Sequence, residues 1–526
     1  MDILFGQSYY LRFDPKLYAA MQPYPPLGTL YAASAMRKRG YSVALFDAML
    51  AESEQEWADA LDQYQPTYAV IYEDNFNYLS KMCLLNMRQA AFNMICMASE
   101  RGRTVIVAGS DATDHYADYL NVGADFVILG EGEETLAELV DQLTLSNEQS
   151  TMKDWSAIPG LAFKNAHPPP VTIHNSQFTI HKSPPRPVMR DIDTLPFPAW
   201  DLVDVEKYKL IWYERHGYYS MNMVTTRGCP YHCNWCAKPI WGQRYNSRSP
   251  ENVAQEMRWL KETYQPDHIW FVDDIMGLKP GWWHAFADMV ERYQARIPFK
   301  CLSRADLIVR NEKNVDALAR AGCDIVWMGA ESGSQKILNA MEKGTTVEQI
   351  YEAARRLHQV GIKVAFFLQF GYPGETREDI EKTLQLVRDC QPDNIGMSVS
   401  YPLPGTKFYE NIKLQLGNKQ NWSDSADLAM MYRGPFATPF YRQLHIVLHK
   451  EFRSRRAWQE LKRVVLKPAQ WRRHHWREAA ASVYRLATLP LARLKLNRLA
   501  AVPHERVAPM PHMRLEEAAR PSPQEV

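Results

Sequence analysis

A run of three closely spaced cysteines constrains this chain of 526 residues more than any other feature. The run is Cys229-Pro230-Tyr231-His232-Cys233-Asn234-Trp235-Cys236, and it follows Val224-Thr225-Thr226-Arg227-Gly228. The preceding residues have the pattern of a strand that ends at a glycine, so we expect the thiols on a loop at a strand's carboxyl end. Three thiolates on one loop can bind three irons of a cubane cluster and leave the fourth iron without a protein ligand.

Two other interpretations of the cysteine run stay open at this point. A structural zinc ion would need a fourth ligand, and His232 lies inside the loop, where we expect it to point away. Alternatively, the three thiols are unrelated buried side chains. The other cysteines are scattered in apolar surroundings and are expected to be reduced core residues of a cytosolic protein: Cys83, Cys96, Cys301, Cys323 and Cys390.

The spacing Cys-x3-Cys-x2-Cys, with Trp235 just before the last cysteine, resembles that of the radical S-adenosylmethionine (SAM) superfamily. The resemblance implies that Cys229, Cys233 and Cys236 bind a [4Fe–4S] cluster. It also implies that the open iron binds the amino and carboxylate groups of SAM. An electron from the cluster then cleaves SAM to a 5′-deoxyadenosyl radical. The sequence identifies no other catalytic residue.

Residues 1–145 alternate short apolar runs with helical patterns, which predicts a doubly wound parallel sheet. We expect its strands at 2–5, 42–46, 68–72, 104–108 and 125–129, with helices between them, for example at 27–39 and 79–101. Ligands of such sheets bind beyond the carboxyl ends of the strands. Small and polar residues at these ends are the candidate ligand-binding residues: Gln7, Ser8, Asn75, Gly109, Ser110, Gly130 and Glu131.

Three segments of this domain carry a further resemblance, to the N-terminal cobalamin-binding domain of cobalamin-dependent radical SAM enzymes. They are Pro25-Pro26-Leu27-Gly28, Gly109-Ser110-Asp111-Ala112-Thr113 and Gly130-Glu131-Gly132-Glu133. The resemblance implies that the candidate residues at the strand ends bind cobalamin. The motif Asp-x-His-x-x-Gly is absent from the sequence, so no histidine is expected below the cobalt. A flavodoxin-like domain that binds no corrinoid is the alternative.

Residues 146–220 are punctuated by proline and have little periodicity, so they are expected to form an ordered linker. A hairpin is expected around residues 171–181. The aromatic side chains of the linker either line a substrate cavity or pack between domains: Trp200, Tyr208, Trp212, Tyr213, Tyr218 and Tyr219.

Residues 221–401 repeat a strand–helix unit six times. The strands are expected at 223–226, 268–272, 299–303, 324–328, 363–370 and 394–400. Repeated βα units predict a barrel-like parallel sheet with its chemistry at the carboxyl ends of the strands. This organisation is similar to the partial (β/α)6 barrel of radical SAM proteins, so the predicted fold class is α/β throughout.

The polar residues at the expected strand ends match the needs of SAM. An acid could bind the ammonium group, another could accept from the ribose hydroxyls, and an apolar strip could hold the adenine. Each segment resembles its counterpart in cobalamin-type radical SAM enzymes, and Glu375 is expected to cap a helix instead. The candidate SAM-binding residues are Trp235, Asp273, Asp274, Ser303, Arg304, Glu331, Phe367 and Gln369.

Residues 402–500 are expected to form a helical extension, which resembles that of the anaerobic magnesium-protoporphyrin monomethyl ester cyclase type. Residues 441–500 carry fifteen Lys and Arg against three Glu, whereas the whole chain has a net charge of +1. The basic aromatic stretch at 465–500 is either a solvated face or a site of peripheral membrane contact. RNA binding is a third reading of it, but no nucleic acid partner is expected. Residues 501–526 are expected to be disordered.

Together these features predict a cytoplasmic radical SAM enzyme that uses a [4Fe–4S] cluster, SAM and cobalamin, with an external flavodoxin, ferredoxin or reductase as electron donor. The expected reaction is methyl transfer to an unactivated carbon of a small-molecule or lipid substrate. Oxidative cyclisation or hydroxylation of a tetrapyrrole-like or other apolar substrate is the alternative. A non-catalytic metal-binding module is the alternative of a different class.

Overall fold

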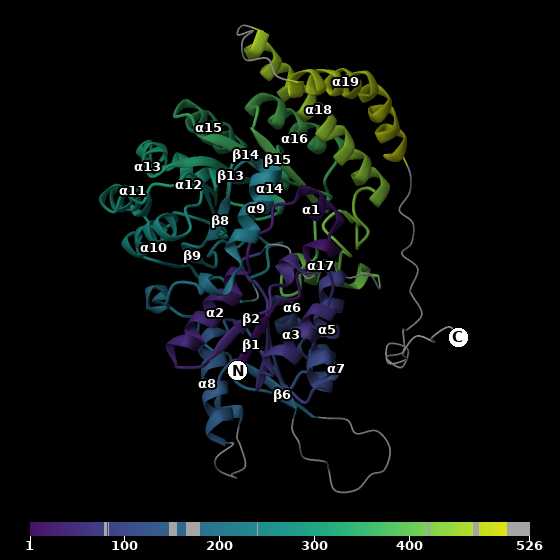
Figure 1. Cartoon of the computed structure of the whole chain (residues 1–526). Coiled ribbons are helices and arrows are strands. Elements are labelled where there is room, and N and C mark those ends of the chain that lie inside the picture. Colours follow the sequence, from purple (N-terminus) through teal and green to yellow (C-terminus); the bar gives the residue numbers. More distant parts are fainter. Residues whose placement is uncertain are drawn as a thin grey trace.

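A computed structural model describes residues 1–77, 81–82, 84–146, 155–164, 179–238, 240–417, 421–465 and 473–501, with side chains left undescribed at 459–465 and 473–479. Figure 1 shows an N-terminal α/β domain next to a second α/β domain, with two long helices packed at the far end of the second. The predicted hairpin around 171–181 lies mostly outside the described residues, as do the tail at 502–526 and Cys83.

The N-terminal domain is built on a seven-stranded sheet with the order β2-β1-β3-β4-β5-β6-β7. Strands β1 to β5 are parallel, as predicted, and β6 and β7 add to the edge in antiparallel fashion. The strands are Ile3–Gly6, Val43–Leu45, Tyr68–Tyr72, Thr104–Ala108, Phe126–Ile128, Leu161–Lys164 and Ile180–Lys182. The helices are α1 Pro15–Ala20, α2 Leu27–Lys38, α3 Gln55–Tyr64, α5 Leu85–Glu100, α6 Ser110–Asp114, α7 Tyr116–Val122 and α8 Glu133–Ser146.

The central strands of this sheet are buried on both faces, which explains their continuous apolar runs. Alternate residues of β3 belong to two separate cores: Ala69 and Ile71 pack on one face, and Val70 and Tyr72 on the other. The doubly wound class predicted for residues 1–145 is therefore confirmed.

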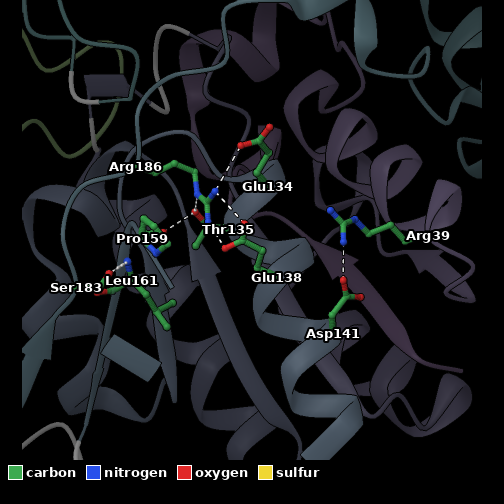
Figure 2. Close-up of polar contacts among 9 residues, drawn as sticks. All are labelled: Arg39, Glu134, Thr135, Glu138, Asp141, Pro159, Leu161, Ser183 and Arg186. Carbon is green, nitrogen blue, oxygen red and sulfur yellow. Dashed lines mark hydrogen bonds and ion pairs between the residues drawn. The ribbon is translucent and has the colours of Figure 1, made fainter. Parts of the chain in front are cut away.

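Part of the segment expected as a linker belongs to this domain. Strands β6 and β7 extend its sheet, and Arg186, which follows β7, contacts α8. Figure 2 shows Arg186, whose Nε donates to Thr135 Oγ1 (2.7 Å) and whose Nη1 donates to Glu138 (3.2 Å). β6 and β7 have only four and three residues, which is too short for a strand pattern to be recognised in the sequence. Of the linker aromatics, Trp200, Tyr208, Trp212 and Tyr219 are fully buried in the core, as the packing alternative predicted, whereas Tyr213 and Tyr218 are exposed.

The second domain is a six-stranded parallel sheet with the order β15-β14-β13-β12-β11-β8. Its strands are Ser220–Met223, His268–Phe271, Phe299–Ser303, Cys323–Glu331, Lys363–Phe370 and Asn394–Val399. Its helices are α10 Pro250–Thr263, α11 Trp282–Arg292, α12 Ala305–Val309, α13 Lys313–Ala321, α14 Gln335–Ala340, α15 Val347–Gln359 and α16 Arg377–Cys390. Helix α9, Val205–His216, leads into it. The predicted series of βα units is confirmed.

The first strand of this sheet begins and ends three residues earlier than the predicted range of 223–226. Strand β8 ends at Met223, and Thr226–Arg227 forms β9, which pairs with β10 (Asn246–Ser247). Asp273 explains the break, because its Oδ1 accepts from the backbone N–H groups of Thr225 (2.6 Å) and Thr226 (2.8 Å). The parallel ladder stops where a side chain takes over its hydrogen bonds.

The C-terminal extension consists of α17 (Lys407–Ile412), α18 (Thr438–Val465) and α19 (Arg473–Leu499). Arg388 of α16 donates to Glu451 of α18 (2.6 Å), and Arg493 of α19 donates to the same carboxylate (2.6 Å). This buried acid therefore joins α18 and α19 to the barrel. Among the helices that the structure describes, none combines the length and hydropathy needed to cross a bilayer.

Candidate active site

The cysteine loop lies beyond the carboxyl end of β8, as the sequence predicted. It begins at Gly228, whose φ of +77° lies in the left-handed region and whose Cβ, if present, would lie 2.4 Å from Arg244 O. Only glycine fits both conditions. Farther along, Asn234 N donates to Met341 O (3.0 Å), and Asn234 Nδ2 donates to Ala340 O (2.7 Å). The loop is thus anchored to the segment that follows α14.

The three thiols of the loop are near neighbours. Burial raises the pKa of Cys236 to about 12, and the charges of Cys229 and Cys233 add to that shift. Among the described residues, no three Cys, His, Asp or Glu side chains converge closely enough for a single metal ion. In a cubane each thiolate binds a different iron, so its three sulfurs stand farther apart than the ligands of one zinc ion. Three thiolates on one loop can each bind a different iron, so the donor set fits a [4Fe–4S] cluster.

Arg304, at the carboxyl end of β12, holds the cysteine loop to the barrel. Its Nη1 lies 3.8 Å from Cys233 Sγ, and its guanidinium lies 3.7 Å from the centre of the Tyr231 ring. Its other donors bind Asp306 Oδ1 (2.8 Å), Lys343 O (2.7 Å) and Thr345 Oγ1 (2.9 Å). These contacts commit most of the guanidinium to the protein itself.

The two acids after β11 have different surroundings. Asp273 is buried and uses both carboxylate oxygens on Thr225 and Thr226, directly before the cysteine loop. Burial raises its pKa to about 6, against those hydrogen bonds. Asp274 forms an ion pair with Lys81 of the N-terminal domain (2.6 Å). Both acids lie at the carboxyl edge of the sheet, as predicted, and each already has a partner within the protein.

The remaining candidates for SAM binding gather around the same edge. Glu331 ends β13 with φ of +56°, and Lys343 Nζ donates to its Oε1 (2.9 Å). Gln369 Nε2 donates to Ser400 Oγ (3.1 Å), and Ser303 Oγ donates to Met276 O (3.3 Å). Phe367 lies lower on the inner face of β14 and is 38% exposed, as a binding surface for a flat ring requires.

Trp235, the aromatic residue of the loop, carries an unpaired polar atom. Its Nε1 is buried and has no hydrogen-bond partner among the described residues. A buried indole N–H without an acceptor is uncommon. This donor therefore remains available to a bound cofactor.

The predicted cobalamin-binding residues meet at one edge of the N-terminal sheet. Ser8 N donates to Glu73 Oε1 (3.0 Å), and Ser110 Oγ donates to Asn75 Oδ1 (3.4 Å). A Cβ on Gly109 would lie 2.8 Å from the Glu73 side chain, so that position needs glycine. Gln7 folds back on its own chain and accepts from Tyr9 N (2.5 Å).

These groups suit cobalamin, whose corrin ring is rimmed by neutral amide side chains. Gln7, Ser8, Asn75 and Ser110 are neutral amides and hydroxyls, whereas Glu131 is an acid that pairs with Arg227. The buried hydroxyl of Tyr9, which follows Ser8 in the chain, has no hydrogen-bond partner among the described residues. Burial also raises the pKa of Glu73 to about 7, so this carboxyl holds a proton part of the time near neutral pH. Residues 1–146 contain one histidine, His115, and its Nε2 lies 3.7 Å from Asp111 Oδ1.

Sequence reasoning missed the residue that joins the two sites, Arg227. Its Nη1 donates to Glu131 Oε1 (2.5 Å) and its Nη2 to Glu133 Oε1 (2.6 Å), and all three side chains are buried. The only sequence signal for a role of Arg227 was its position immediately before the cysteine loop. A single basic residue does not indicate which acid it pairs with. A Cβ on Gly130 would lie 3.5 Å from Ile240 O, so the loop after β5 contacts the segment that follows the cysteine loop.

Comparisons with known proteins agree with this arrangement. The sequence model of the radical SAM superfamily matches residues 223–387. The chain is 27% identical to an uncharacterized methyltransferase of Pyrococcus horikoshii, over 73% of this chain and 78% of that one. It is 26% identical to the anaerobic magnesium-protoporphyrin IX monomethyl ester cyclase of Synechocystis, over 73% and 72% of the two chains.

A solved structure shares the fold. It is the radical SAM methyltransferase TsrM from Kitasatospora setae, with cobalamin and a [4Fe–4S] cluster bound. The similarity has a TM-score of 0.62 at 20% identity and covers 79% of this chain and 78% of the other. The two-domain architecture is therefore a known one.

The barrel of this chain is a radical SAM domain. The protein is accordingly an enzyme that uses a [4Fe–4S] cluster and SAM, as the resemblance predicted, and the assignment of Cys229, Cys233 and Cys236 as the cluster ligands stays a prediction. The similarity to TsrM covers 79% of this chain and therefore extends beyond the radical SAM domain.

Proposed function

We propose that this protein is a cobalamin-dependent radical SAM methyltransferase that acts on an unactivated carbon of a small molecule. The single observation that carries the proposal is the contact between the two candidate sites. Arg227 precedes the cluster loop directly, and both of its acidic partners follow β5 of the N-terminal domain. The edge suited to cobalamin therefore abuts the loop suited to the cluster.

Further contacts support the same junction. Phe76 stacks on Trp241 with ring centres 5.0 Å apart, and Lys81 pairs with Asp274. Phe76 and Lys81 follow β3, whereas Trp241 and Asp274 belong to the barrel. Several buried pairs fix the relative position of the sites, as a reaction shared between two cofactors requires.

When bound, the cluster supplies the electron that cleaves SAM and cobalamin supplies the methyl group. In this proposal Cys229, Cys233 and Cys236 bind the irons, and Arg304 fixes the loop that carries them. Trp235, Glu331, Gln369 and Phe367 surround SAM with Ser303 and the acids after β11. Gln7, Ser8, Asn75, Gly109, Ser110 and Gly130 hold the corrin. Glu131 acts through its ion pair with Arg227.

The test is anaerobic purification, cluster reconstitution, and incubation with dithionite, SAM and hydroxocobalamin. Methyl transfer requires cobalamin that stays bound through desalting, together with 5′-deoxyadenosine or S-adenosylhomocysteine as SAM products. Retained cobalamin without either SAM product would contradict the proposal. A SAM product without retained cobalamin would leave a radical SAM enzyme whose N-terminal domain is only a scaffold.

Oxidative cyclisation or hydroxylation is the second candidate. Its support is the similarity to the cyclase, which covers 73% of this chain and therefore extends beyond the barrel. SAM labelled in its methyl group separates the two candidates, since only a methyltransferase moves the methyl carbon of SAM into a product.

We also propose that α19 rests on the cytoplasmic surface of an anionic membrane, and that an external flavodoxin- or ferredoxin-type protein reduces the cluster. One face of α19 exposes Val483, Leu486, Leu491 and Leu494, interspersed with Arg493, Lys495 and Arg498. Apolar side chains flanked by basic ones are typical of interfacial helices. Co-sedimentation with vesicles rich in phosphatidylserine tests this; equal recovery after Leu491→Glu and Leu494→Glu would refute it.

A further inference from the structure

The inner face of the barrel sheet carries a row of five side chains below the SAM region, and four of them are at least partly exposed. The strand registers align five residues across neighbouring strands: Asn222, Trp270, Lys300, Ile325 and Lys363. Residues that alternate with them, such as Ile269 and Val326, are completely buried under the helices. Trp270, Lys300 and Ile325 are only half-buried, so they face the open side of the partial barrel.

Lys300 is the unusual member of this row. Its ammonium lies 4.2 Å from the centre of the Trp270 ring and 5.2 Å from that of Tyr24. Among the described residues it forms neither a hydrogen bond nor an ion pair. Burial lowers its pKa to about 7, and no acid offsets that effect. Aromatic faces stabilise a cation without neutralising it, so this ammonium lacks a counter-ion.

The groups around Lys300 are arranged for one negative charge. His268 lies on the neighbouring strand, and burial lowers its pKa to about 4, so its imidazole is neutral. Its Nδ1 lies 2.8 Å from Ser220 Oγ, to which Tyr24 also donates (3.0 Å). Lys363, in the same row, is exposed and already pairs with Asp324 (2.9 Å). A single ammonium matches a carboxylate better than a phosphate, which usually takes several donors.

An aromatic strip joins Lys300 to the SAM region. Trp327 lies opposite Leu302, two residues above the Lys300 position, and packs on Phe367 with ring centres 4.6 Å apart. Ser303 is the third residue after Lys300, which is about 10 Å along a strand. A molecule bound between Lys300 and SAM would therefore contact aromatic and aliphatic side chains along its length.

We propose that Lys300 binds a carboxylate of the substrate, while Trp270, Leu302 and Trp327 contact an aromatic or apolar body. The inference rests on the proposed function, because it assigns a substrate class to that site: a small aromatic or apolar monocarboxylate. Tyr24 comes from the N-terminal domain, so this domain also contributes to the substrate pocket.

The test compares 2-naphthoate with its neutral analogue 2-naphthamide on the full-length, cluster-loaded protein, by anaerobic calorimetry. We expect naphthoate to bind about tenfold more tightly, the effect of one charge-assisted contact. Lys300→Met should abolish that preference and keep naphthamide binding. Lys300→Arg should restore it in part. Lys363→Met is the matched control, since it removes a lysine of the same row that already has a partner.

Two results would overturn the inference: equal binding of both probes by the native protein, or an unchanged preference in Lys300→Met. Thermal melting adds a third readout. Because Lys300→Met removes a desolvated ammonium with no counter-ion, its melting temperature should equal or exceed that of the native protein. A lower melting temperature with loss of both probes would show a structural lysine instead. SAM cleavage in the same samples reports separately on the proposed function.

Discussion

Arg227→Gln tests the junction between the two candidate sites. Arg227 is 2% exposed, and its partners Glu131 and Glu133 are 8% and 5% exposed. The substitution leaves two buried carboxylates without their cation. Removing one partner of a buried ion pair costs about 3–5 kcal/mol, and we expect a loss in that range in the free energy of unfolding. Arg37→Gln is the control, since its pair with Asp201 is exposed and worth about 0–1 kcal/mol.

The pH dependence of Arg227→Gln follows from the same geometry. Burial already raises the pKa of Glu131 in the native protein, and loss of Arg227 removes the nearby charge that lowers it. A carboxyl whose pKa is higher in the folded state binds more protons there, so stability falls as pH rises above the unfolded pKa. The variant should therefore regain stability as pH is lowered from 7.5 to 5.5.

Anaerobic urea denaturation at several pH values, with iron and cobalamin content of the same samples, measures both effects. The native protein and Arg37→Gln should retain both cofactors, whereas Arg227→Gln should lose cobalamin and part of its iron. If Arg227→Gln has the same urea midpoint as the native protein at pH 7.5 and keeps both cofactors, then the Arg227 ion pairs do not hold the two sites together.

Three further predictions concern the cluster loop and a buried acid. Cys229→Ala should retain less iron than the native protein and form no 5′-deoxyadenosine. Cys96→Ala, which removes an exposed thiol, should keep the native iron content and still form 5′-deoxyadenosine. Equal iron content in the two variants would contradict the ligand assignment. Gly228→Ala forces a side chain into the left-handed region against Arg244 O, so iron incorporation should fall several-fold; native iron content would show that the loop can rearrange. Burial raises the pKa of Glu375 to about 8, so the native protein should lose about 2 kcal/mol between pH 6 and pH 8 that Glu375→Gln does not lose. Parallel urea titrations of the native protein and Glu375→Gln measure that difference, and identical pH profiles would refute it.

The sequence predicted most of the fold because the hydrophobic patterns are unambiguous. Strands β3, β4, β12 and β14 lie where the apolar runs placed them, since each run is bounded by turn residues. Strand β8 was misplaced because the pairing of Thr225 and Thr226 with Asp273 is a long-range contact. Strands β6 and β7 were missed for a similar reason: their pairing depends on an edge that only the folded sheet provides.

The candidate site was predictable where chemistry is encoded locally. The spacing of three cysteines on one short loop resembles that of radical SAM proteins, so Cys229, Cys233 and Cys236 could be predicted from the sequence as cluster ligands. The partner of a lone charge cannot be read in this way. The pairing of Arg227 with Glu131 joins residues nearly a hundred positions apart, and the isolation of Lys300 appears only when its neighbours are known.

The most direct measurement for the central claim uses SAM labelled with ¹³C in its methyl group and protein loaded with both cluster and cobalamin. The methylcobalamin recovered from the native protein should carry the label, and that from Cys229→Ala should not. Label absent from cobalamin, with SAM still cleaved to 5′-deoxyadenosine, would contradict a methyltransferase and favour the oxidative alternative.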